Sequence, residues 1–165
     1  MPESCQAAAD RADEHFHEHY NCAQSVLWGV TETYDLACPS CIPAAALAMG
    51  GGIGHTGRAC GALTGAVMAI GLAVDRAVGG SISDRKDEAN RLAAALVHRF
   101  ADEFGTTDCA TILGFSWEDS GALERYNREN AKDEKCTPCI RWAAAEAVRI
   151  IEDLDAGTPA NDEGR

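Results

Sequence analysis

Apolar residues recur at helical spacing along most of the chain, and no run of alternating β-branched residues indicates a strand. The clearest amphipathic stretch begins at Ser81 or Ser83 and ends at Phe104, with an apolar stripe on one face and charged residues on the other. Helical patterns also cover the ranges 5–19, 22–34, 43–49 and 109–115, and a last helix runs from Cys136 or Pro138 to Asp155. The strongly polar range 116–135 predicts a loop with one weak helix. The chain is therefore expected to be all-α.

One predicted helix, over residues 60–74, is apolar on almost every side, which is typical of a helix buried on all faces. Gly61 and Gly65 lie one turn apart on it. Each glycine costs a helix about 1 kcal/mol relative to alanine, so their presence indicates close packing by other backbones. We expect a single-domain helical bundle around this glycine- and alanine-rich central helix. The helices that follow Asn21, Ser83 and Cys136 are expected to surround it.

Length and charge narrow the possible functions. The 165 residues suit one domain, predicted over 1–155, with a disordered tail over 156–165. A net charge of −12 argues against nucleic acid or an anionic membrane as a partner. The longest apolar run is shorter than the roughly 20 residues that cross a bilayer, and the N-terminal residues do not have the pattern of a signal peptide. We therefore expect a cytoplasmic protein, and the 46% hydrophobic content in a helix-only fold suggests a homodimer.

Eight cysteines in a reducing compartment favour metal binding or redox chemistry over structural disulfides. Cys60 stands where a glycine-rich loop meets the central helix, so backbone N–H groups and the helix dipole would favour its thiolate. Cys22 occupies the first turn of another helix, with Asn21 as the N-cap. Cys60 and Cys22 are therefore the candidate catalytic thiols. The candidate cofactor contacts are Gly57, Arg58 and Gly61, which flank Cys60 together with His55.

Two further patterns carry less weight. His15 and His19 share a helix face with metal-ligand spacing, but no second cluster accompanies them, so a solvated face is the favoured interpretation. Residues 52–57 have the spacing of a dinucleotide fingerprint, GxGxxG. That motif requires a preceding strand, whereas the alanine-rich range 43–49 predicts a helix. The cysteines therefore remain the main candidates for functional residues.

Four local motifs around cysteines occur together in the chain. They are Asn21-Cys22-Ala23-Gln24, the glycine-rich loop leading into Cys60-Gly61-Ala62-x-x-Gly65, Cys109 followed by Ile-Leu-Gly, and Cys136 before an alanine-rich helix. In these motifs the chain, from about Phe16 to Ile151, resembles the C_GCAxxG_C_C family of redox-active proteins. The resemblance implies a small, mostly helical redox protein whose four cysteines act together. Split-Soret cytochromes are similar in their non-haem part, which implies an iron–sulfur cluster.

The identity of the ligands and of the chemistry remains open at the level of sequence. One candidate metal-ligand set is Cys22, Cys60, Cys109 and Cys136, and its rival is the two Cys-x-x-Cys pairs, Cys38, Cys41, Cys136 and Cys139. Cys38, Cys41 and Cys139 are additions to the family pattern, and the role of Cys5 is open. The first function considered is an iron–sulfur or other thiophilic metal site that passes electrons to a redox partner protein. The alternatives are thiol–disulfide exchange with Cys60 as the nucleophile, without a cofactor, and a structural zinc module.

Overall fold

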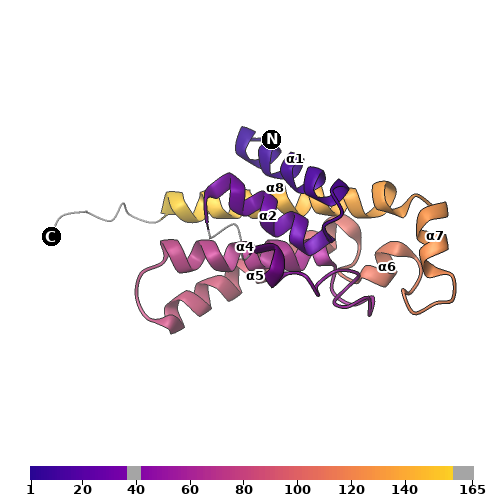
Figure 1. Cartoon of the computed structure of the whole chain (residues 1–165). Helices are drawn as coiled ribbons and strands as arrows, with labels where there is room; N and C mark the ends of the chain where they lie inside the picture. Colours follow the sequence, from indigo (N-terminus) through magenta and orange to yellow (C-terminus); the bar gives the residue numbers. More distant parts are fainter. Residues whose placement is uncertain (37–41, 158–165) are drawn as a thin grey trace.

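The structure is a computed structural model that describes residues 1–36 and 42–157. Within these residues the chain forms helices and no sheet, so the all-α expectation is confirmed (Figure 1). The elements are α1 (Glu3–His17), α2 (Cys22–Tyr34), α3 (Ile42–Ala45), α4 (Gly61–Ala77), α5 (Ile82–Phe104), α6 (Cys109–Leu113), α7 (Ala122–Arg128), the π-helical turn η1 (Lys132–Cys136) and α8 (Thr137–Gly157). No helix of the described residues is both long and apolar enough to cross a bilayer.

Helix α4 is the centre of the bundle, as the sequence predicts. It packs against α2, α5 and α8, and α1 covers α2 and α8 from the other side. Most of its alanines and aliphatic residues are buried, because neighbouring helices cover it on several faces, whereas Val67, Leu72 and Ala77 are half-buried. Figure 1 shows the short helices α6 and α7 at one end of the bundle, the same end at which the glycine-rich segment leads into α4.

Two glycines let α2 approach the N-terminal half of α4. A Cβ atom on Gly65 would lie 2.4 Å from the carbonyl oxygen of Ala23, and one on Gly61 would lie 3.1 Å from Cβ of Cys22. Real Cβ atoms do not come within 3.0 Å of such neighbours, so Gly65 sits where only glycine fits without a shift. The close approach brings the N-terminal ends of α2 and α4 together, and these are the ends that carry Cys22 and Cys60.

Three expectations about element boundaries need correction. The predicted helix over 43–49 is the single turn α3, because the N–H groups of Leu47 and Met49 bond to carbonyls only three positions back, those of Ala44 and Ala46, and so form turns instead of continuing the helix. The range 116–135 contains α7 and most of η1, and is therefore less of a loop than its polarity predicts. Helix α8 continues through Gly157, so 156–157 are helical rather than part of a disordered tail, and 158–165 lie outside the described residues.

Candidate functional site

A small apolar cavity of about 10 Å³ is lined by five cysteines. They come from four places in the chain: the first residue of α2, the residue before α4, the first residue of α6, and the junction of η1 with α8. The lining cysteines are Cys22, Cys60, Cys109, Cys136 and Cys139. The structure thus brings together all four cysteines of the first candidate ligand set, and adds Cys139 from the rival set.

Backbone hydrogen bonds hold Cys60 beside Cys109. The N–H of Cys109 donates to the carbonyl of Arg58 at 2.7 Å, and the N–H of Cys60 donates to the carbonyl of Thr107 at 2.8 Å. Ala59 and Asp108 form an isolated antiparallel bridge between these two bonds. Two cysteines about fifty positions apart in the sequence are therefore fixed by main-chain contacts, which do not depend on side-chain rotamers.

The glycine-rich segment gets its shape from residues with left-handed backbone conformations. Gly51, Gly52, Gly54 and Gly57 have φ between 61° and 74°, and so do the non-glycine residues Ile53 at 64° and His55 at 62°. Non-glycine residues in this region cost of order 1–3 kcal/mol, and such strain is concentrated at functional sites. The fold therefore keeps this segment in one unusual shape beside the cysteines.

The residues predicted to contact a cofactor help to hold the glycine-rich segment and Cys22 in place. The N–H of Gly57 donates to the carbonyl of Gly51, and the N–H of Arg58 donates to the carbonyl of Gly52, each at 3.0 Å. Gly61 packs against Cys22. None of Gly57, Arg58 and Gly61 is among the described residues that line the cavity. Their contact with a cofactor stays a prediction, whereas their part in positioning Cys60, Cys109 and Cys22 is visible.

Asn21 fixes Cys22 and the segment before the glycines at the same time. Its side-chain oxygen accepts hydrogen bonds from the N–H groups of Ala23 and Gln24, which makes it the N-cap predicted for α2. Its side-chain nitrogen donates to the carbonyls of Ala46 and Leu47, at 3.1 and 3.0 Å. One side chain therefore ties the start of α2 to the chain that enters the glycine-rich segment.

We predict that Asn21→Ala destabilises the protein by about 1–2 kcal/mol, the usual cost of losing an N-cap. Asn21→Asp is the matched variant, because it keeps the capping oxygen and loses only the donor to Ala46 and Leu47. Urea unfolding should therefore rank the wild type first, Asn21→Asp second and Asn21→Ala last. If Asn21→Ala unfolded at the wild-type urea concentration, the capping role would be contradicted.

Cys136 and Cys139 reach the cavity because they lie three positions apart where η1 continues into α8, on one helix face. Cys136 is the last residue of the π-helical turn η1, a distortion that is frequent at functional sites. The hydroxyl of Tyr126 lies 3.8 Å from Sγ of Cys136 and donates a hydrogen bond to it. Cys139 is an addition to the family pattern, and its Cys-x-x-Cys spacing from Cys136 is the signal that placed it in the rival ligand set.

The thiols of Cys60 and Cys139 are in direct contact. A hydrogen bond from Cys139 is the largest influence that lowers the pKa of Cys60, and the backbone N–H groups of Ala62 and Leu63 lower it further. These N–H groups belong to the first turn of α4, as the helix-start argument predicts. Cys60 is therefore the cavity thiol whose pKa is lowered, in spite of its burial.

The pKa of Cys22, the other cysteine at the start of a helix, shifts in the opposite direction. The pKa of Cys22 is raised, first by its hydrogen bond with Cys136 and then by burial. At Cys22 the contact with a second thiol and burial therefore outweigh the helix dipole, and its role as a catalytic thiol stays a prediction. Burial also raises the pKa of Cys109 to about 12. The indole N–H of Trp117 acts in the opposite direction on Cys109, and its nitrogen makes no standard hydrogen bond within the described residues.

The remaining candidates lie elsewhere. Cys38 and Cys41, half of the rival ligand set, are outside the described residues. Cys5 is buried in α1 and does not line the cavity. The solvated face predicted for the histidines is wrong for His15, whose side chain is only 12% exposed. Its ring stacks on Trp28 at 4.1 Å, and its Nε2 lies 2.9 Å from a carboxylate oxygen of Glu32.

Residues 20–150 match the family described as "Putative redox-active protein (C_GCAxxG_C_C)". The chain belongs to this family. The match covers all five cysteines of the cavity and the glycine-rich segment. No curated protein and no solved structure matches the chain significantly. The family resemblance drawn from the four cysteine motifs is therefore confirmed.

Proposed function

We propose that the cysteine cavity is a redox centre whose thiolates hold an iron–sulfur cluster, or another thiophilic metal, for electron transfer. The observation that carries this proposal is the convergence of five sulfur atoms from four parts of the chain on one apolar cavity. A disulfide needs only two of them. Thiolates are the donors preferred by iron–sulfur clusters and other thiophilic metals. When bound, such a group supplies one-electron transfer.

The donor set fits such a centre in its chemistry. Every residue that lines the cavity is either a cysteine or has an apolar side chain, and N–H groups of Ala62, Leu63 and Trp117 favour the thiolates of Cys60 and Cys109. The thiols are packed closely, and no His, Cys, Asp or Glu group of three or more among the described residues is arranged to hold a metal ion. Metal uptake would therefore require the side chains to turn apart and to release protons.

The proposed ligands are the four family cysteines, Cys22, Cys60, Cys109 and Cys136. In this assignment Cys139 is the hydrogen-bond partner of Cys60 rather than a ligand. Burial supports a metal centre over exchange with a protein disulfide, because Cys60 and Cys109 are only 6% and 7% exposed. The cytoplasmic location, the homodimer and the redox partner protein stay predictions.

A second candidate function is favoured by the contact between Cys60 and Cys139. In thiol–disulfide exchange the Cys60 thiolate would attack the disulfide of a small oxidised substrate, forming a mixed disulfide and releasing one thiol. The sulfur of Cys139 would then attack Cys60, closing a Cys60–Cys139 disulfide and releasing the second thiol. Overall, two cysteines lose two electrons and two protons, and the substrate disulfide gains them. The lowered pKa of Cys60 suits the first step.

The deciding experiment is purification without oxygen, followed by visible absorbance, iron and acid-labile sulfide measurements. We expect visible absorbance with iron and sulfide in stoichiometric amounts. The matched control is Cys5→Ser, which alters a buried cysteine outside the cavity and should keep the metal. Metal-free protein that forms a Cys60–Cys139 disulfide on oxidation, identified by peptide mass spectrometry, would contradict the metal proposal and support exchange.

A further inference from the structure

A second cavity, of about 380 Å³, lies beside the cysteine cavity. The two cavities share Cys22, Cys109, Leu113 and Cys136 in their walls. The rest of the larger cavity is formed by the end of α1, the glycine-rich segment, and the chain from α6 to α7. We call it the aromatic pocket. A molecule held there would lie against three of the five cysteines of the centre.

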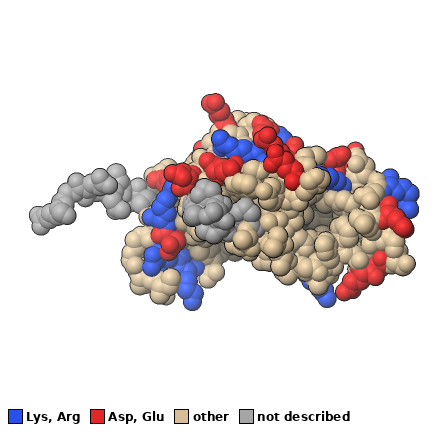
Figure 2. All heavy atoms as spheres, viewed as in Figure 1, with Lys and Arg blue, Asp and Glu red and all other residues tan. Residues whose placement is uncertain are grey.

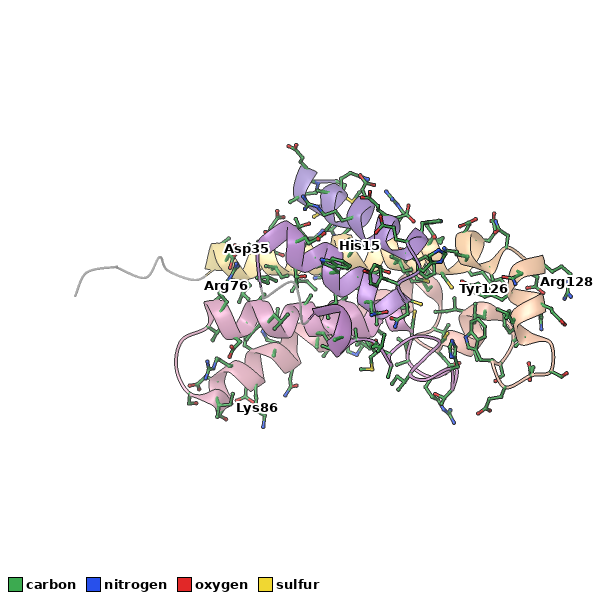
Figure 3. The ribbon with its side chains drawn as sticks, in the orientation of Figure 1. His15, Asp35, Arg76, Lys86, Tyr126 and Arg128 are labelled. Carbon is green, nitrogen blue, oxygen red and sulfur yellow. The ribbon has the colours of Figure 1, made fainter. Side chains whose placement is uncertain are left out.

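Ring systems dominate the wall of the aromatic pocket. Phe16, His55, Trp117 and Tyr126 line it from different segments. The ring centroid of Trp117 lies 5.0 Å from that of His55 and 5.1 Å from that of Tyr126, so these three side chains form a continuous wall. Figure 3 shows Tyr126 on the side of α7 that faces the bundle, with Arg128 pointing outward. Such walls suit a flat aromatic ligand.

The charge of the pocket narrows the class of ligand. Among the described residues that line it, none is Asp, Glu, Lys or Arg. Figure 2 shows acidic side chains grouped over α1, and few charged side chains on the surface between the glycine-rich segment and α7. A charged ligand would lose water without gaining an opposite charge, which is costly. Its polar side chains are those of Asn21, His55, Trp117 and Tyr126, of which His55 and Tyr126 suit a single oxygen substituent.

The glycine-rich segment is shaped around one ring of this wall. A Cβ atom on Gly51 would lie 2.2 Å from the His55 ring, so the ring occupies space that only glycine leaves open. His55 itself has a φ of 62°, a conformation that costs energy for a non-glycine residue. Backbone strain and a missing side chain thus both serve to hold the imidazole against Trp117.

We propose that the aromatic pocket binds a small uncharged aromatic molecule of one or two rings that carries an oxygen substituent. Its volume lies within the usual range of ligand pockets, about 300–1,000 Å³. The ligand stacks against Trp117 and Tyr126, and its edge reaches Cys22 and Cys136. Its exchange of electrons with the cysteine centre rests on the proposed function, whereas its binding does not.

The test compares 1-naphthol with 1-naphthalenesulfonate, two probes with the same rings and different charge. Isothermal titration of the full chain should show saturable binding of one 1-naphthol per chain. The sulfonate should bind at least about tenfold more weakly, because its charge is desolvated without a partner. Equal affinity for both probes, or no saturable binding of 1-naphthol, would overturn the proposal.

Variants locate the binding. Ala48 is exposed and lines the pocket, so Ala48→Trp should fill it and weaken 1-naphthol binding at least about tenfold without disturbing the core. Trp117→Leu should also weaken binding, because it removes the central ring of the wall. The matched control is Leu123→Trp, at a residue of α7 that is 64% exposed and outside the pocket lining. Unchanged affinity in both pocket variants would place the probe elsewhere and refute the assignment.

Iron and visible absorbance are measured on the same preparations. Protein that binds 1-naphthol in the pocket but never contains metal would disprove the metal centre and leave the pocket proposal standing. Protein that contains metal but does not bind 1-naphthol would disprove the pocket proposal and leave the metal centre standing.

Discussion

Cys60→Ser is expected to remove the bound metal and the visible absorbance of anaerobically purified protein while leaving its helical content unchanged. Serine keeps the shape of cysteine, but its hydroxyl is not ionised near neutral pH and is a poor ligand for a soft metal. We expect iron per chain to fall more than about tenfold, in line with the loss of one thiolate from a centre that needs four. Stability should change little, because a serine before Gly61 can cap α4.

Cys139→Ser separates the two candidate functions. If the four family cysteines hold a metal, this variant keeps most of its iron, because Cys139 is only the hydrogen-bond partner of Cys60. If the pair works by thiol–disulfide exchange, the same variant cannot close the second disulfide and stalls as a mixed disulfide. Iron retained in Cys60→Ser, together with an unchanged fastest-reacting thiol, would refute both assignments of Cys60.

The pH dependence of thiol modification tests whether the pKa of Cys60 is lowered. Its pKa is lowered from the ordinary value of 9.0, so the thiolate persists at a lower pH than for a free cysteine. Because burial raises the pKa of Cys109 to about 12, this thiol stays protonated over the pH range in which Cys60 titrates. In metal-free protein, the fastest reaction with iodoacetamide should therefore have a midpoint below pH 9.0 and should disappear in Cys60→Ser.

The pattern of apolar residues predicted the bundle because its strongest signals are periodic and local. Helix α2 begins after the N-cap Asn21 and α5 begins after the N-cap Ser81, as expected. Helix α5 ends before Gly105. These ends could be predicted because capping depends on residues within one turn. The prediction of a helix over 43–49 was wrong beyond Ala45. The N–H groups of Leu47 and Met49 bond three positions back, and the distant side chain of Asn21 bonds to the carbonyls of Ala46 and Leu47. Alanine content does not reveal these contacts.

Only part of the candidate site could be predicted from the sequence. The motifs around Cys22, Cys60, Cys109 and Cys136 placed four thiols together through family resemblance, whereas periodicity alone could not have paired segments so far apart. The aromatic pocket was not foreseen. Trp117 and Tyr126 stand in a range that is polar overall, and Trp117 meets His55 where main-chain bonds tie the glycine-rich segment to α6.

Gly65→Ala is expected to destabilise the protein by about 1–3 kcal/mol, the usual cost of overpacking a well-packed interior. The added Cβ would lie 2.4 Å from the carbonyl oxygen of Ala23, which is backbone and cannot rotate away. Helices α2 and α4 would have to move apart at this crossing. Because Cys22 and Cys60 stand at the ends of these helices, the metal content should fall as well.

Gly71→Ala is the matched control, because Gly71 lies on the same helix and an added Cβ there meets nothing within 4 Å. This variant should gain up to about 1 kcal/mol from the better helix propensity of alanine and keep its metal. Urea unfolding of the two variants under identical conditions should therefore move the midpoint in opposite directions, with equal slopes. Equal midpoints would mean that the α2–α4 crossing tolerates a side chain at Gly65. In that case close backbone approach would not be what brings Cys22 and Cys60 together.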